Sequence, residues 1–128
     1  MSDRSELIEL HNRLSKTLDE ERGAAREKRY EKGYRTAREN LDDLVDKDSF
    51  VEYGQLAIAA QKSRRELEEL RTETAADGII TGFGKINSEI LDDKKALSAI
   101  IINDYSVLAG TQGYYHHKKL DRICETAE

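Results

Sequence analysis

The sequence predicts a mixed α+β fold, and two patterns carry that prediction. Residues 100–102 form an Ile-Ile-Ile run, which is suited to a strand buried on both faces. After Gly113 the apolar residues recur at three- and four-residue spacing, as in a helix: Leu120, Ile123, Cys124 and Ala127. Between them lies a glycine-bearing bend. At such a junction layered α/β proteins present backbone N–H groups to ligands, although the glycines also suit a plain, tightly packed connection.

Composition narrows the class of protein. A chain of 128 residues fits one small domain at most, or a piece of a larger one. The net charge of −5 argues against a general nucleic-acid binder, and no apolar run approaches a membrane span. Cys124 is the single cysteine and residues 1–9 do not resemble a signal peptide, so we expect a cytoplasmic setting. Hydrophobic residues make up 38% and charged residues 37%, which indicates that some apolar surface belongs to a partner or to a missing remainder of the protein.

The first element expected is a helix capped by Ser5. Its leucines share one face: Leu7, Leu10, Leu14 and Leu18. This stripe is short for a coiled coil but is suited to packing on a neighbouring subunit.

A basic stretch follows, with seven cationic residues: Arg22, Arg26, Lys28, Arg29, Lys32, Arg35 and Arg38. One interpretation is a solvated helix in which Glu27 and Glu31 pair with the neighbouring lysines. The other is a patch for a phosphate-bearing partner.

Thr36 is the next candidate helix cap, because Glu39 stands three residues on, at the spacing of a capping box. Leu41, Leu44 and Val45 then form the predicted buried face of a short helix. Residues 50–53 are expected to form a short strand.

The centre of the chain predicts a charged helix over residues 61–71 and then an antiparallel hairpin. Asp77-Gly78 turns the chain into a strand over 79–86, and a polar connection leads to a second strand over 96–103. The Gly82-Phe83-Gly84 sequence is not a phosphate loop, since no helix follows it. Glycines inside a strand indicate a bulge or a close backbone approach.

Side chains suited to catalysis are few. His116 and His117 point about 100° apart on a helix and cannot share a metal, while His117 and Asp121 are spaced for a surface pair. Cys124 is predicted to be a buried helix residue about 10 Å from His117, too far for a Cys–His dyad. The acidic pair at 92–93 is expected to be solvated rather than metal-binding. We therefore assign no catalytic residue and no metal site.

Three segments in order carry a family resemblance. They are A-R-E-N-L-D-D-L-V-D-K-D-S-F-V-E (37–52), D-G-I-I-T-G-F-G-K-I-N (77–87) and N-D-Y-S-V-L-A-G-T-Q-G (103–113). Together they resemble the start of the carboxyltransferase domain of biotin-dependent acyl-CoA carboxylases, of the acetyl- and propionyl-CoA carboxylase β type. The resemblance covers about residues 34 to 128. It implies N-terminal helices (residues 1–48) followed by the first ββα unit of a crotonase-like superhelix (residues 49–128), as the N-terminal portion of a longer domain.

The resemblance also implies a function. In the family a carboxyl group passes from carboxybiotin to the α-carbon of an acyl-CoA through an enolate held by backbone oxyanion holes. Biotin is attached to a separate carrier domain in the family. The implied partners are therefore acyl-CoA, the biotin carboxyl carrier and biotin carboxylase. The resemblance also implies a homo-oligomer. The basic stretch would suit the 3′-phosphate of coenzyme A or the carrier domain.

The implied CoA-side residues of this chain are Leu108, Ala109, Gly110 and Thr111. Ala109-Gly110 departs from the commoner Gly-Gly pair of the family. The peptides that form the oxyanion holes come later in the family sequence, so we expect these 128 residues alone to be inactive. The alternative functions are a stand-alone helical interaction module and a regulatory homologue that docks on a full-length carboxyltransferase.

Overall fold

The computed structural model describes residues 2–60, 66–107 and 113–128. The helices and strands follow one another as α1 (Ser2–Ser15), α2 (Gly23–Glu31), α3 (Ala37–Leu44), β1 (Val51–Tyr53), α4 (Leu67–Glu73), β2 (Ile79–Lys85), α5 (Asp93–Ala96), β3 (Leu97–Asn103) and α6 (Tyr114–Ala127). Two 3-10 turns, Asp19–Glu21 and Ala75–Gly78, precede α2 and β2. The predicted mixed α+β class is confirmed.

The three strands form one antiparallel sheet in the order β1-β2-β3. β2 and β3 pair along their whole length, from Ile79 opposite Asn103 to Lys85 opposite Leu97, so the predicted hairpin is confirmed. The predicted close approach at Gly82 is also confirmed. A Cβ atom there would lie 2.1 Å from the carbonyl oxygen of Val51 on β1, so only glycine fits this position.

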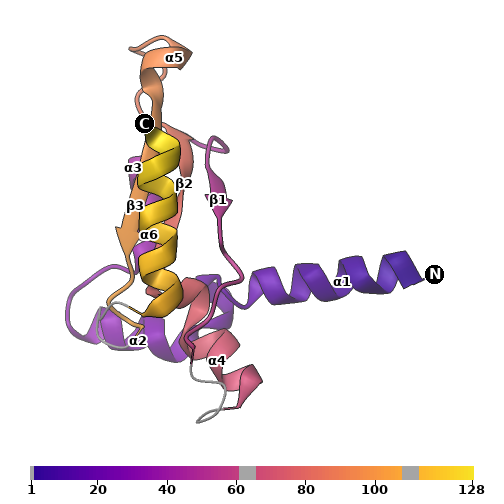
Figure 1. Ribbon diagram of the computed structural model, residues 1–128. Coiled ribbons are helices and arrows are strands. Elements are labelled where there is room, and N and C mark those ends of the chain that lie inside the picture. Colours follow the sequence, from indigo (N-terminus) through magenta and orange to yellow (C-terminus); the bar gives the residue numbers. More distant parts are fainter. Residues whose placement is uncertain (1, 61–65, 108–112) are drawn as a thin grey trace.

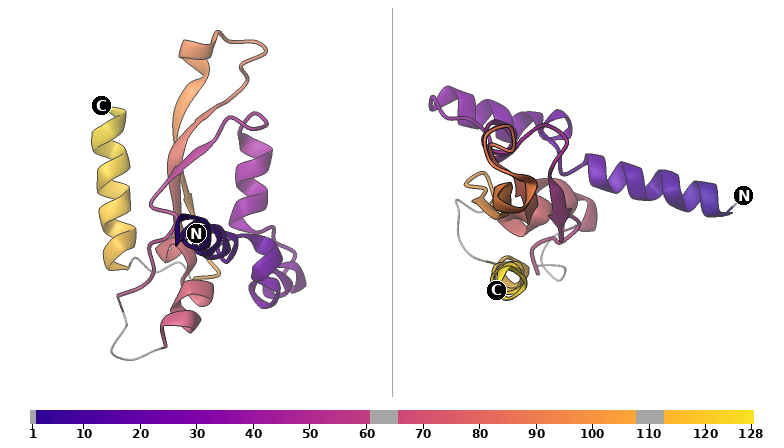
Figure 2. Two further views of the ribbon diagram at one scale, coloured as in Figure 1. Left: turned by 90° about the vertical axis from the view of Figure 1, so that its right-hand side faces the viewer. Right: turned by 90° about the horizontal axis from the view of Figure 1, so that it is seen from above.

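Helices cover both faces of the sheet. α3 lies on one face and α6 on the other (Figures 1 and 2). The α3 side holds a core cluster of Ala37, Leu41, Ile80 and Ile100. On the other side α6 packs along β2 and β3 and buries Ile123. The capping box predicted at the start of α3 is present, with the Thr36 hydroxyl and Glu39 carboxylate each bonded to the other residue's backbone N–H.

Helix α1 extends away from the rest of the molecule (Figure 1). It begins at Ser2, so Ser5 lies inside the helix rather than at its cap. Leu7 is 53% exposed and Leu10 42% exposed, and only Leu14 is half-buried. The leucine stripe exists, but within the described residues it has little to pack against.

Two predictions about buried faces were wrong. Ile101 is exposed, because only alternate residues of β3 face α3, and α6 leaves the other side of this edge strand partly open. Leu44 is exposed at the last turn of α3, beyond the reach of the sheet. The predicted helix over 61–71 is seen as α4 from Leu67 onward, and residues 61–65 lie outside the described part. Among the described residues, no helix is long and apolar enough to cross a bilayer.

Candidate functional site

The turn that leads into β2 has an unusual backbone. Ala76, Asp77 and Gly78 have φ angles of 55°, 48° and 76°, so three successive residues lie in the left-handed region. Ala75 through Gly78 are buried. Residues with side chains are strained in this region and persist there only where surrounding contacts hold them.

Asp77 holds the first turn of α6. Its Oδ2 atom accepts a hydrogen bond of 2.8 Å from the backbone N–H of His116, a carboxylate at the positive end of the helix dipole. Gly113 precedes α6, and a Cβ atom there would lie 2.6 Å from Oδ1 of Asp77. The His116 ring is buried, and its Nδ1 lies 3.0 Å from the Asp77 carbonyl oxygen. Since a carbonyl only accepts, this contact places the proton on Nδ1.

Lys119, one helical turn further along α6, contacts the same left-handed segment before β2. Its ammonium group donates to the carbonyl oxygens of Ala76 at 2.8 Å and Ile79 at 2.5 Å. Burial lowers the pKa of Lys119 to about 8, and Glu52 and Asp77 oppose that shift while Arg38 adds to it. The left-handed turn is therefore fixed by two side-chain contacts from α6.

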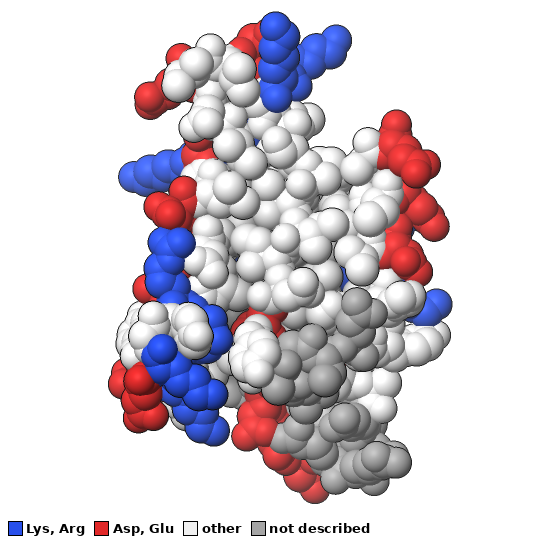
Figure 3. Space-filling model, turned by 90° about the vertical axis from the view of Figure 1, so that its left-hand side faces the viewer, with Lys and Arg blue, Asp and Glu red and all other residues white. Residues whose placement is uncertain are grey.

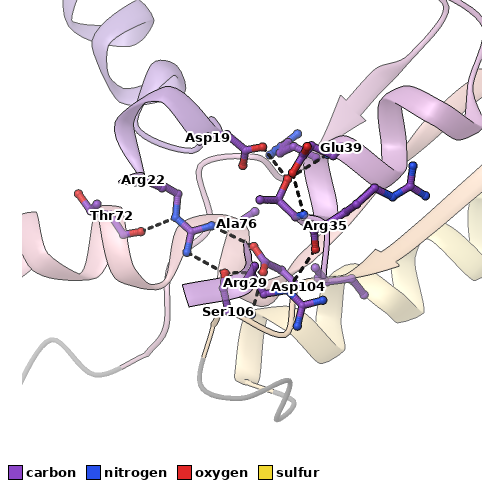
Figure 4. A network of polar contacts seen from close by, with 12 residues as sticks. Asp19, Arg22, Arg29, Arg35, Glu39, Thr72, Ala76, Asp104 and Ser106 are labelled. Carbon is purple, nitrogen blue, oxygen red and sulfur yellow. Dashed lines mark hydrogen bonds and ion pairs between the residues drawn. The ribbon is translucent and has the colours of Figure 1, made fainter. Parts of the chain in front are cut away.

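Arg22 fixes the segment that follows β3 (Figure 4). Its guanidinium donates to Asp104 Oδ2 at 3.0 Å, to Ser106 Oγ at 3.2 Å and to the Thr72 carbonyl at 2.9 Å. Both charged side chains are nearly buried, with 6% of Arg22 and 14% of Asp104 exposed. One arginine thus joins the start of α2, the end of α4 and the turn after β3.

The predicted CoA-side residues, Leu108, Ala109, Gly110 and Thr111, lie outside the described residues. Their two flanks are described, and both meet the left-handed turn. Val107 is buried against Gly78, where a Cβ atom would lie 3.2 Å from the Val107 side chain. On the far side, Gly113 lies against Asp77. Asp77-Gly78 is therefore the common anchor of both ends of this segment.

An open groove of about 460 Å³ lies beside the near end of that segment. Lys28 lines it from α2 and Lys32 from the position just after that helix, and Tyr105 and Ser106 line it from the turn after β3. Arg29 also lines it, with its guanidinium 5.7 Å from the centre of the Tyr105 ring and 4.8 Å from that of Tyr34. Arg22 and two acidic residues, Glu21 and Glu73, complete the charged lining.

The basic stretch therefore divides into two groups. Arg22 pairs with Asp104, Arg35 with Asp43, and Arg38 with Glu52. Lys28 and Lys32 instead line the groove. Nothing in the linear sequence separated these groups, because the acidic partners lie at distances of 8 to 82 residues along the chain.

The remaining candidate catalytic side chains do not come together in one site. Cys124 is exposed, which corrects the prediction of a buried residue: α6 turns His116, Leu120 and Ile123 inward, and Cys124 lies about 100° round from Ile123. His117 and Asp121 pair on the surface at 3.9 Å as predicted. No group of three or more His, Cys, Asp or Glu side chains suited to a metal occurs in the described ranges.

The chain belongs to the carboxyl transferase domain family, whose model matches residues 28–128. Among curated proteins it is 35% identical over 122 residues to the biotin-dependent acetyl-/propionyl-coenzyme A carboxylase beta5 subunit of Mycobacterium leprae. It is 30% identical to the methylmalonyl-CoA decarboxylase subunit alpha of Veillonella parvula. These matches cover 94% and 89% of this chain, but only 20% of each relative, so the chain spans about a fifth of their length.

Solved structures agree. A single-chain, multi-domain long-chain acyl-CoA carboxylase matches 95% of this chain with a TM-score of 0.92 and 49% identity, over 12% of its own length. Transcarboxylase 12S, described as a hexamer with methylmalonyl-coenzyme A bound, matches 98% of the chain with a TM-score of 0.67 and 27% identity, over 22% of its own length. The fold described above is therefore part of the carboxyltransferase fold.

Proposed function

We propose that these 128 residues serve a biotin-dependent acyl-CoA carboxyltransferase as the segment that positions the acyl-CoA. In this proposal residues 1–48 are an N-terminal helical segment, and residues 49–128 contain the first ββα unit of a crotonase-like superhelix, made of β2, β3 and α6. The observation that carries the proposal is the shared anchor at Asp77-Gly78, which fixes Val107 and Gly113 on either side of residues 108–111.

The groove supplies a place for the phosphate-bearing end of the same ligand. Lys28, Arg29 and Lys32 are cations beside Glu21 and Glu73, so the lining keeps an excess of positive charge. Tyr105 is 56% exposed and offers an aromatic face at the same opening. Since Tyr105 stands three residues before position 108, one ligand can reach both the groove and the predicted CoA-side segment.

The reaction of the whole enzyme would transfer a carboxyl group from N1′ of biotin to the α-carbon of the acyl-CoA. The bond from N1′ to the carboxyl carbon breaks, and N1′ takes the proton that leaves the α-carbon. The resulting enolate, whose oxygen is stabilised by backbone N–H groups, then forms the new carbon–carbon bond with the released carboxyl carbon. Carboxybiotin arrives as a substrate on its carrier. In this proposal the residues of this chain contribute positioning of the acyl-CoA.

A binding experiment tests this proposal. Calorimetric titration of the 128-residue chain with coenzyme A should show weak, salt-sensitive binding, because exposed ion pairs are screened by salt. Lys28→Gln with Lys32→Gln should weaken that binding roughly three- to tenfold, which corresponds to about 1 kcal/mol. The matched control, Lys94→Gln with Lys95→Gln on α5, removes the same charge elsewhere and should leave binding unchanged.

Two results would contradict the proposal. Equal coenzyme A binding by the Lys28/Lys32 variant and the Lys94/Lys95 control would show that the groove does not bind coenzyme A. Carboxyl transfer by this chain alone, with carboxybiotin and an acyl-CoA, would overturn the expectation that the segment positions substrate without turnover.

A second candidate is a regulatory homologue that docks on a full-length carboxyltransferase. The exposed leucines of the projecting helix α1 favour it, since they offer an apolar stripe to a partner. The all-helical interaction module is not a candidate, because the chain contains a three-stranded sheet. Co-purification of the chain with a full-length carboxyltransferase, tested with and without Leu7→Lys, separates docking from simple substrate positioning.

A further inference from the structure

The groove beside the turn after β3 has three walls, and each wall comes from a different part of the chain. α2 forms the first wall, and the end of α4 forms the second with Thr72 and Glu73. The turn after β3 forms the third wall with Tyr105 and Ser106. A ligand can contact all three walls at once only where contacts between the walls hold them at a fixed spacing.

Arg22 lies where the three walls meet. It directly precedes α2, so its backbone belongs to the first wall. Its Nε atom donates to the Thr72 carbonyl of the second wall at 2.9 Å, across 50 residues of sequence. Its two terminal nitrogens donate to Asp104 Oδ2 at 3.0 Å and to Ser106 Oγ at 3.2 Å, both in the third wall. Because a guanidinium is planar and directs its N–H groups along fixed lines, one side chain sets the spacing of all three walls.

Asp104 makes the third wall rigid. Its Oδ1 atom accepts hydrogen bonds from the Ser106 backbone N–H at 2.9 Å and from the Ser106 hydroxyl at 2.5 Å. Its backbone N–H donates to the Gly78 carbonyl at 2.8 Å, and its carbonyl accepts from the Val107 N–H at 3.1 Å. Tyr105 lies between Asp104 and Ser106, so its backbone is held on both sides.

The charge of Arg22 is already neutralised inside the molecule. Its side chain is 6% exposed and that of its partner Asp104 is 14% exposed. Lys28 and Lys32, in contrast, are exposed. Basic side chains gather at the lower left of Figure 3, at the end of the molecule where α2 lies in Figure 1. The lysines are therefore the cations that a phosphate can approach, and Arg22 acts on a ligand through the residues that it holds.

We propose that Arg22 is a positioning residue for the acyl-CoA, which sets the spacing between the lysines of the first wall and Tyr105 of the third. This inference rests on the proposed function, because it concerns the same groove. It goes further by assigning a role in substrate affinity to a buried side chain that pairs with Asp104 instead of with the ligand.

A substitution that conserves charge tests the inference. Arg22→Lys keeps the positive charge but loses the planar fork, so it cannot reach Thr72, Asp104 and Ser106 together. NMR titration with coenzyme A, which also measures weak affinities, should give a dissociation constant roughly three- to tenfold above that of the wild-type chain.

Arg38→Lys is the matched control. Arg38 and Glu52 form a comparably buried ion pair, with 13% and 7% of their side chains exposed, and neither residue lines the groove. This variant should lose stability but bind coenzyme A as the wild type does. Circular dichroism and urea unfolding show whether each variant is folded at the temperature of the titration.

Asp104→Asn is a second variant that keeps the shape of the side chain. It removes a negative charge near the groove, so simple electrostatic attraction of the coenzyme A phosphates would make binding tighter. Positioning predicts the opposite sign, because the third wall loses its charged link to Arg22. The dissociation constant for coenzyme A should therefore rise, by roughly two- to fivefold.

A double-mutant cycle shows which residues Arg22 acts through. Arg22→Lys should weaken binding much less in a chain that already carries Lys28→Gln and Lys32→Gln, since the cations to be positioned are gone. Additive losses would overturn the inference. So would wild-type affinity in a folded Arg22→Lys chain, equal losses from Arg22→Lys and Arg38→Lys, or tighter binding by Asp104→Asn.

Failure of the inference and failure of the proposed function give different results. If the wild-type chain binds coenzyme A and the Lys28/Lys32 variant binds it more weakly, while Arg22→Lys binds as the wild type does, only the inference fails. If the wild-type chain does not bind coenzyme A, the proposed function fails and the inference fails with it.

Discussion

The Asp77 carboxylate accepts a 2.8 Å hydrogen bond from the backbone N–H of His116, across 39 residues of sequence. This contact joins the left-handed turn before β2 to the first turn of α6. Because Gly78 packs against Val107 and Asp77 packs against Gly113, the same turn also sets the spacing between the two ends of residues 108–111. The two described flanks of the predicted CoA-side residues are therefore held by a turn about 30 residues earlier in the chain.

Removing the Asp77 carboxylate should destabilise the fold. Asp77→Ala deletes a cap and a favourable charge at the helix N-terminus, so we expect the free energy of unfolding to fall by about 1–2 kcal/mol. Asp77→Asn keeps an oxygen that can accept from His116 and tolerates the positive φ, so it should cost less. Urea unfolding measures both values. Equal stability of Asp77→Ala and the wild type would show that the contact does not hold α6.

Adding a methyl group at Gly113 should also destabilise the fold. Its Cβ atom would lie 2.6 Å from the Asp77 carboxylate, so Gly113→Ala must push the turn and α6 apart, at a cost of roughly 1–3 kcal/mol. Gly23→Ala is the matched control, since nothing lies within 4 Å of a Cβ atom there. That change should be neutral or stabilising by up to about 1 kcal/mol, because alanine favours helices. Thermal and urea unfolding measure both variants. A Gly113→Ala variant as stable as Gly23→Ala would show that the close approach at Gly113 is wrong.

Lys119 should make stability depend on pH in the alkaline range. Its pKa is about 8 in the folded chain and near 10.5 when unfolded. Between these values the unfolded chain binds more protons than the folded chain, so the free energy of unfolding should rise with pH, by at most about 1.4 kcal/mol per unit. Below pH 8 both states are protonated and the contribution is constant.

Lys119→Met isolates this contribution. Other titrating groups cancel when the two proteins are compared by urea unfolding at each pH. The wild type should gain stability relative to the variant between pH 8 and 10, since Lys119 then loses its proton while two carbonyl oxygens remain in contact with it. Parallel stability profiles across this range would show that Lys119 is not desolvated as described.

The Arg22–Asp104 pair should be strongly coupled. Both side chains are nearly buried, so Arg22→Met leaves an unpaired carboxylate and should cost about 3–5 kcal/mol. Asp104→Asn combined with Arg22→Met should cost less than the sum of the two single changes. Arg35→Met is the control: its pair with Asp43 is exposed, so the loss should be within about 1 kcal/mol. Additive single and double losses would mean that Arg22 acts through packing alone.

Local features of this fold could be predicted from the sequence, because each depends on neighbouring residues. The capping box of Thr36 and Glu39, the hairpin of β2 and β3 and the glycine-limited approach at Gly82 are all present. Each is recognised from spacing within one element or between adjacent elements.

Features that depend on distant contacts could not be predicted in this way. The sequence marked Asp77-Gly78 as a turn but did not show that Asp77 caps a helix 39 residues later. It placed Cys124 and Ile101 inside, since apolar periodicity does not say how far a covering layer extends. The basic stretch gave no sign that Arg22 and Arg38 would be buried in ion pairs while Lys28 and Lys32 face a groove.

The measurement that tests the central claim most directly is a segment exchange. The matching segment of the long-chain acyl-CoA carboxylase, which is 49% identical, is replaced by these 128 residues, and carboxyl transfer to acyl-CoA is assayed. We expect activity within about tenfold of the parent, or about 1.4 kcal/mol in the barrier, and a further loss when the inserted segment carries Asp77→Ala. A chimera that folds and assembles but transfers no carboxyl group would contradict the claim that this chain positions acyl-CoA in a carboxyltransferase.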